Sequence, residues 1–208
     1  YKNGDKNSNL IDKLSYKSEI KNNDSLATEL YSIILNNQSE YDRTIIERAD
    51  FYFAKLALKN KDISKINSFI DSYQDSDRVG DAYNQLVYHY KSIKDTLSEI
   101  NTLKKMVSLF SDNPSNLNRY AWRMTELNTE LKDALIKIDK ALNLTDKTDS
   151  SYPQLLDTKA EILWRMGLFD DAITIINEAI SIDNEYQYYK DQRDKFKKSK
   201  SEINNEPI

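Results

Sequence analysis

The sequence predicts an all-α fold built from antiparallel helix hairpins, and two observations carry this prediction. The 208-residue chain contains only three Gly and three Pro, which disfavours the many tight turns that β-sandwiches and loop-rich folds need. Apolar residues also recur at helical spacing, for example at Ile45, Ile46, Ala49 and Phe53. Short polar turns separate these stripes, so neighbouring helices are expected to run antiparallel.

Five helix pairs follow one another along the chain. Each pair has an apolar stripe in both helices and a polar turn between them, such as Asn22-Asn23-Asp24 or Lys94-Asp95. Acidic residues after the turn lie near the positive end of the second helix, which also accounts for Asp170-Asp171. The predicted pairs are 10–20 with 24–34, 41–58 with 63–70, 77–90 with 97–110, 117–124 with 134–141, and 155–167 with 169–184.

The second helices recur at a fixed interval. Ile66, Ile100 and Ala134, which we place at the centres of three successive second helices, are each 34 residues apart. The next step, to Ala172, is 38 residues, and the surplus falls in the polar loop 145–151. A constant interval of this size indicates stacked structural repeats, and insertions between repeats are expected in loops.

The segment from Leu155 to Asn184 resembles one tetratricopeptide repeat (TPR), a family of repeats of about 34 residues that form two antiparallel helices. The residues that match the family's small positions are Ala160, Gly167, Ala172 and Ala179, and the larger matches are Leu156, Leu163, Phe169 and Ile176. Lys159 and Asn184 depart from the family pattern, which has Leu and Pro there. The resemblance implies an α-α superhelix, a right-handed solenoid whose concave face is lined by the first helix of each pair.

The resemblance also sets the expected domain organisation. Residues 1–8 are expected to be a disordered or linker segment, and 9–184 a TPR-like domain of four to five hairpins, most regular at 115–184. Residues 185–199 place Tyr186, Tyr189, Arg193 and Phe196 on one helical face, which predicts a capping helix over the last repeat. Residues 200–208 are expected to be a disordered tail.

Positions that line the concave groove in the family carry over to a mixture of amides, aromatic rings and charges. Such a mixture suits a peptide, because amides pair with its backbone while Trp, Tyr and Arg supply contact area. For Tyr88 and Trp122 the alternative is packing against neighbouring helices, and for Trp164 it is burial under the capping helix. The groove positions are Tyr52 and Lys55 beside Phe51; Asn84, Gln85 and Tyr88; Asn118, Arg119 and Trp122; and Asp157, Thr158, Glu161 and Arg165, with Trp164 near the rim.

The sequence carries no pattern for catalysis, a metal or a cofactor. Its single histidine, His89, has no second histidine or nucleophile at a recognisable spacing, and Cys is absent. The net charge of −4 disfavours nucleic acid as a partner, and no apolar run has the length of a membrane span. Arg119 alone matches the clamp with which some TPR proteins hold a C-terminal carboxylate, so that clamp is not expected. We therefore expect a non-enzymatic protein with a protein or peptide partner.

Two alternatives to a peptide-binding scaffold stay open at this point. The blocks LNRYAWRM and LLDTKAEILWRMG are similar to TPR extensions of bacterial envelope thioredoxin-like proteins. On that view the chain is the C-terminal helical module of a larger thiol-redox enzyme whose catalytic domain lies upstream of Tyr1, and the bacterial periplasm or envelope is favoured over the cytoplasm. The other alternative is weak self-association through an exposed repeat face.

Overall fold

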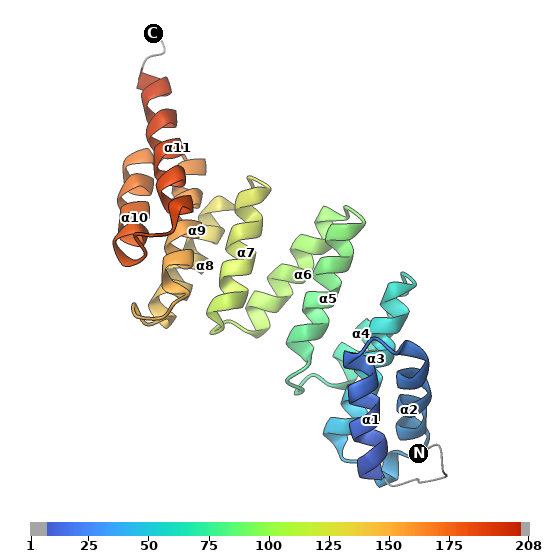
Figure 1. Ribbon diagram of the computed structural model, residues 1–208. Helices are drawn as coiled ribbons and strands as arrows, with labels where there is room; N and C mark the ends of the chain where they lie inside the picture. The colour runs from blue at the N-terminus through green and yellow to red at the C-terminus, as the bar shows by residue number, and fades with distance from the viewer. Residues whose placement is uncertain (1–7, 205–208) are drawn as a thin grey trace. The chain divides into compact units, whose positions relative to one another are not determined.

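The structure is a computed structural model that describes residues 8–204, and these residues are helical with no strand among them (Figure 1). The all-α fold class predicted from the sequence is confirmed. No helix in this part of the chain is both long and apolar enough to cross a membrane. The helices are α1 (Ser8–Ile20), α2 (Asp24–Asn36), α3 (Arg43–Lys59), α4 (Ser64–Ser72), α5 (Val79–Ser92), α6 (Thr96–Leu109), α7 (Pro114–Glu126), α8 (Leu131–Leu144), α9 (Tyr152–Arg165), α10 (Phe169–Ile182) and α11 (Gln187–Asn204), with a short 3₁₀ helix at Gln38–Glu40.

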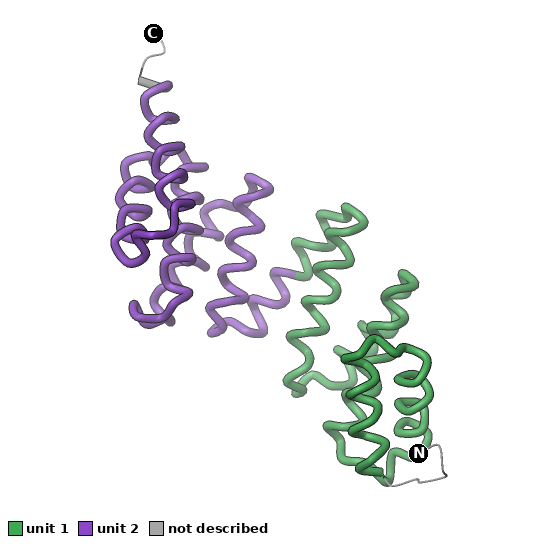
Figure 2. The backbone as a smooth tube through the Cα atoms, in the orientation of Figure 1, with its two compact units in different colours: residues 1–102 green, residues 103–208 purple. Residues whose placement is uncertain are grey.

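The chain divides into two compact units, residues 1–102 (unit 1) and 103–208 (unit 2), as Figure 2 shows. The sequence predicted one repeat domain over 9–184, whereas the division falls inside α6. The predicted linker at 1–8 lies outside the described residues except for Ser8, which begins α1. The predicted tail is helical as far as Asn204, because α11 runs from Gln187 to Asn204 rather than over 185–199. Residues 205–208 lie outside the description.

Unit 1 is held together by apolar side chains that the first three helices bury between them. α1 packs on α2, α2 on α3, and α3 on α4. Leu30, Tyr31 and Ile34 occupy one stripe of α2 and are fully buried, as expected for residues three and four apart on one helical face. Tyr31 and Tyr52 lie with their ring centroids 4.7 Å apart, so aromatic packing joins the first hairpin to α3.

Unit 2 has its core where α9 and α10 meet each other and α11. The small residues Ala160, Ala172 and Ala179 are fully buried, which allows the two helix backbones to approach closely. Ile176 and Phe196, also fully buried, fill the space beside them. The sequence assigned small and large residues to these positions from the TPR resemblance, and the packing of this hairpin agrees with that assignment.

The first helix of every pair ends in the same way. The residues after the helix ends, Asn22, Lys61, Lys94, Asn128 and Gly167, all have positive φ angles, between 50° and 78°. At the last of these turns, Leu168 N donates to Leu163 O (2.9 Å) and Gly167 N donates to Trp164 O (3.0 Å). This is the bond pattern of a Schellman motif, which satisfies carbonyl groups at a helix C-terminus. Lys61 and Lys94, each followed by an aspartate, thus act as left-handed turn residues.

Replacing Gly167 with alanine is expected to lower the free energy of unfolding of unit 2 by about 1 kcal/mol. The φ angle of Gly167 is 78°, and an added Cβ would have no atom within 4 Å, so the cost is backbone strain alone. Urea unfolding followed by tryptophan fluorescence measures it, because both tryptophans lie in unit 2. Asn128→Gly, which removes a Cβ from a left-handed residue of the same unit, is the reverse substitution and should not destabilise the chain. An unchanged midpoint for Gly167→Ala would contradict this explanation.

The position of the repeat centre in α6 differs from the prediction. Ile66 and Ala134 are fully buried, as expected, but Ile100 of α6 is only half-buried, whereas the preceding residue, Glu99, is 1% exposed. The sequence analysis assigned the inward position to the apolar side chain, because buried carboxylates are uncommon. Leu103, Met106 and Val107 of the same helix are buried, so α6 packs through the face that carries them, and Glu99 rather than Ile100 lies on that face.

Candidate functional site

Three of the predicted groove residues line one cleft in unit 2, between α7 and α9. We call it the α7–α9 cleft. Its volume is about 340 Å³. Asn118, Arg119 and Trp122 come from α7, and Gln154 and Leu155 from α9. The remaining lining residues are Pro114, Ser115 and Ser151.

The start of α7 explains why these side chains face the cleft. Asn113 caps the helix by accepting a hydrogen bond from Asn116 N (3.1 Å), and Pro114 occupies the first turn, where no amide hydrogen is needed. Leu117, Tyr120, Ala121 and Met124 are buried and fix the rotation of the helix. Asn118, Arg119 and Trp122 then fall on a different face and are half-buried. Trp122 is therefore neither enclosed in the core nor fully exposed.

Asn118 presents an unused hydrogen-bond acceptor. Its Oδ1 is buried and has no hydrogen-bond partner among the described residues. A buried acceptor without a donor costs free energy. Such a group therefore either binds an ordered water or can accept a hydrogen bond from a ligand. Its position in the cleft lining makes Asn118 a candidate to accept from an N–H group of a bound molecule.

The predicted groove residues of α9 are mostly covered. Asp157, Thr158 and Glu161 are 8%, 3% and 6% exposed. Glu161 Oε2 lies 2.5 Å from Lys195 Nζ of α11, and its Oε1 lies 3.5 Å from the Nε atom of Arg165, which is exposed. A bound segment would have to displace these contacts to reach Glu161. The groove position inferred from the family therefore does not describe the surroundings of Glu161 in this chain.

Trp164 packs against α11, as the alternative to a rim position anticipated. Its Nε1 donates to Ser199 Oγ (2.9 Å), and its ring stacks on Phe196 with centroids 5.9 Å apart. Lys195 Nζ lies 4.2 Å from the centre of the same ring, a cation–π distance. The C-terminal helix α11 thus covers α9 as well as α10. The sequence could not show which predicted groove side chains α11 would cover.

A second cleft of unit 2 lies between α9 and the beginning of α11, and we call it the α9–α11 cleft. Its volume is about 370 Å³. The pKa of Asp157 is raised to about 7. Burial is the largest cause, the neighbouring Glu161 also raises the pKa, and Lys195 acts in the opposite direction. Sequence reasoning listed Asp157 but missed the tyrosines around it. The lining residues are Ser150, Pro153, Gln154, Asp157, Asp183, Tyr186, Tyr188 and Tyr189.

In unit 1 the predicted groove residues of α3 serve the packing of the first hairpin. Phe51 and Tyr52 are 5% and 4% exposed. The Tyr52 hydroxyl lies 3.1 Å from Thr28 Oγ1 and 3.1 Å from Asp24 O of α2. Lys55 Nζ lies 2.5 Å from Glu19 Oε1 of α1. Tyr52 and Lys55 therefore join the first two hairpins, whereas the ring of Phe51 packs on Phe69 of α4, with centroids 5.1 Å apart. The family pattern did not indicate this because the first hairpin is degenerate in sequence.

The groove residues expected on α5 are more accessible to solvent than those on α3. Asn84 and Gln85 are half-buried, and Tyr88 is 58% exposed. Tyr88 is therefore not a core residue. An exposed aromatic ring beside amide side chains is compatible with peptide contact.

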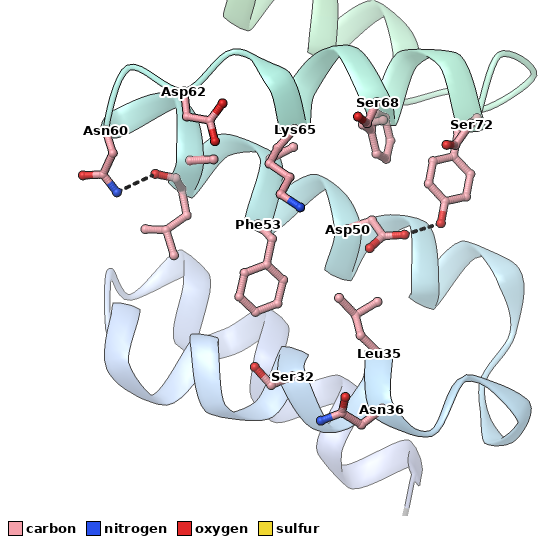
Figure 3. Close-up of a pocket in the computed structure, with 15 residues that line it drawn as sticks. Ser32, Leu35, Asn36, Asp50, Phe53, Asn60, Asp62, Lys65, Ser68 and Ser72 are labelled. Atoms are coloured by element: carbon pink, nitrogen blue, oxygen red, sulfur yellow. Dashed lines mark hydrogen bonds between the residues drawn. The ribbon is translucent and has the colours of Figure 1, made fainter.

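Unit 1 also contains a larger cavity, of about 680 Å³, that the sequence analysis did not predict (Figure 3). It lies between α2, α3 and α4, with Phe53 and Asp50 from α3 facing Leu35 and Lys65. Tyr73, which also lines the cavity, donates a hydrogen bond to Asp50. Two small residues of α4 four positions apart, Ser68 and Ser72, leave this space unfilled, and their spacing is the sequence signal that could have indicated it.

Comparison with known proteins identifies the fold. No family model and no curated protein sequence matches the chain. Solved structures do match. One is the MamA protein, with 14% identity and a TM-score of 0.61 over 87% of this chain and 94% of that one. Another is a tetratricopeptide repeat protein from Parabacteroides merdae, with 13% identity and a TM-score of 0.65 over 90% of this chain and 71% of that one. The class of protein is therefore an all-α helical repeat protein. Within that class its fold is TPR-like, and the predicted resemblance is confirmed. The similarity to extensions of thioredoxin-like proteins remains a hypothesis.

Proposed function

We propose that this chain is a non-enzymatic scaffold that binds a peptide or protein segment in the α7–α9 cleft. The observation that carries the proposal is the convergence of Asn118, Arg119 and Trp122 on one cleft, opposite Gln154 of the next repeat. Each belongs to a residue type that recognises polypeptides. The proposal narrows the predicted groove to the part where three of the predicted side chains line one cleft.

The chemistry of the cleft suits an extended segment. Asn118 Oδ1 has no partner within residues 8–204 and can accept from a backbone N–H, while the Gln154 amide, which is exposed, can both donate and accept. The half-buried indole of Trp122 offers a large apolar face and one N–H donor. Paired amide and aromatic contacts of this kind bind main chain with little dependence on the bound side chains, which suits a scaffold.

Trp122→Ala is expected to weaken peptide binding at least tenfold, because tryptophans at the centre of an interface are the commonest hot spots. The ligand for this test is a peptide selected from a random phage-displayed library on the wild-type chain, and titration calorimetry measures its affinity. Ile136→Ala is the matched control, since Ile136 lies on α8 of the same unit and is 63% exposed. Both variants must keep the wild-type helicity and melting temperature.

Two results would contradict the proposal. Equal affinity of Trp122→Ala and wild type for the selected peptides would place the binding surface elsewhere. Failure of repeated selections to give any peptide that binds the folded chain would argue against a peptide-binding cleft altogether.

A further inference from the structure

The α9–α11 cleft combines three aromatic rings with a buried carboxylate. The rings of Tyr186 and Tyr189 lie at right angles with centroids 4.9 Å apart, and Tyr188 lies 5.7 Å from the first and 6.0 Å from the second. All three line the cleft, together with Asp157 and Asp183. Aromatic faces carry negative potential, so both the rings and the carboxylates favour a positive charge.

The carboxylate of Asp157 lacks the donors that a buried carboxylate needs. The residue is 8% exposed, and its Oδ1 has no hydrogen-bond partner among the described residues. Lys195, the basic residue whose charge acts on Asp157, has its Nζ atom 2.5 Å from Glu161 instead. Asp157 Oδ1 can therefore accept a hydrogen bond from a donor that enters the cleft.

We propose that the α9–α11 cleft binds a hydrogen-bond-donating cation, the ammonium of a lysine or the guanidinium of an arginine, with Asp157 as its counter-charge and Tyr186, Tyr188 and Tyr189 around it. The cation belongs to the polypeptide segment bound in the α7–α9 cleft, so this inference rests on the proposed function and deepens it. Gln154 lines both clefts. One segment that crosses Gln154 reaches both.

The ionisation of Asp157 makes this site sensitive to pH. The charged groups that act on its carboxylate are Glu161 of the same helix and Lys195 of α11, and the hydroxyl groups of Tyr188 and Tyr189 and the carboxylate of Asp183 lie at the cleft. A cation binds the ionised carboxylate and lowers its pKa. Binding is therefore expected to strengthen as pH rises through about 7, where Asp157 loses its proton.

The test uses the full chain and small probes. Nα-acetyl-lysine amide and Nα-acetyl-arginine amide are titrated at pH 8 while ¹H–¹⁵N spectra follow the amides of Tyr186, Tyr188 and Tyr189. We expect saturable shifts with millimolar dissociation constants for both probes. Nα-acetyl-norleucine amide, of similar length without charge, should give no saturation. At pH 5.5 the lysine probe should bind roughly 30-fold more weakly, the ratio given by the ionised fraction of a carboxyl with a pKa of about 7.

Two variants test the assignment to Asp157. Asp157→Asn keeps the shape of the side chain, removes its charge and should weaken the lysine probe at least tenfold at pH 8. Asp171→Asn, an exposed acid in the first turn of α10, is the matched control and should leave binding unchanged. Melting curves of both variants must match the wild type or lie above it.

Three results would overturn the inference: equal binding of the lysine and norleucine probes, equal weakening by both acidic variants, or stronger binding of Nα-acetyl-trimethyllysine amide than of the lysine probe. The last would show an aromatic cage without hydrogen bonds to Asp157. Trp122→Ala should leave the lysine probe unaffected. Loss of the cation site with intact peptide binding refutes this inference alone, whereas retained cation binding without any peptide ligand refutes the α7–α9 cleft proposal.

Discussion

Replacing Phe196 with alanine is expected to lower the free energy of unfolding of unit 2 by about 3–5 kcal/mol, the range for large-to-small changes at buried aromatic residues. Phe196 is fully buried in the core formed with α9 and α10, and its ring stacks on Trp164. The substitution removes that packing and leaves a cavity. Without it, α11 would keep one buried aromatic ring in the core, that of Tyr189, together with the Lys195–Glu161 pair and the Ser199 hydrogen bond.

The measurement is chemical denaturation followed by tryptophan fluorescence, which reports on unit 2 because Trp122 and Trp164 both lie there. Lys197→Ala is the control, since Lys197 is the next residue on the same helix and is exposed. Lysine and alanine differ little in helix propensity. A loss below 1 kcal/mol for Phe196→Ala, or equal losses for the two variants, would mean that α11 contributes little to the core of unit 2.

The stability of unit 2 should also depend on pH through Asp157, and Asp157→Asn should remove that dependence. The pKa of this carboxyl is raised from 3.8 to about 7 by burial. The native state therefore binds more protons than the unfolded state between these values, and stability falls as pH rises through this window. From pH 5 to pH 8 the wild type should lose about 2–3 kcal/mol relative to Asp157→Asn.

The comparison between variants isolates Asp157 from the other acids. Asp95, Asp112 and Glu130 have lowered pKa values because of hydrogen bonds and ion pairs, so they lose stabilising interactions only in more acidic solution. Denaturation midpoints of wild type, Asp157→Asn and the control Asp171→Asn at pH 5, 6, 7 and 8 give the result. Parallel curves for the wild type and Asp157→Asn would show that the carboxyl group is ionised throughout this range, and the proposed cation site would lose its pH dependence.

The sequence determined the helix pairs and the most regular repeat of unit 2. Helical apolar spacing is a local property, so it predicts helices well, and the small residues Ala160, Ala172 and Ala179 mark where backbones meet. The turns were also readable as turns. The sequence did not show which turn residues are left-handed, because Lys61 and Lys94 have no intrinsic preference for positive φ. A Schellman motif forms only with the helix that precedes it.

The tertiary structure alone decided which groove positions are accessible. Asn118, Arg119 and Trp122 stay at a cleft, but Tyr52 is taken into the packing between hairpins and Glu161 is covered by α11. These outcomes depend on side chains that are distant in sequence, Thr28 for Tyr52 and Lys195 for Glu161. A family motif records the positions that face a groove in its regular repeats. It holds no information about a degenerate first hairpin or a terminal helix, and those elements determine whether the predicted groove residues Tyr52 and Glu161 are buried.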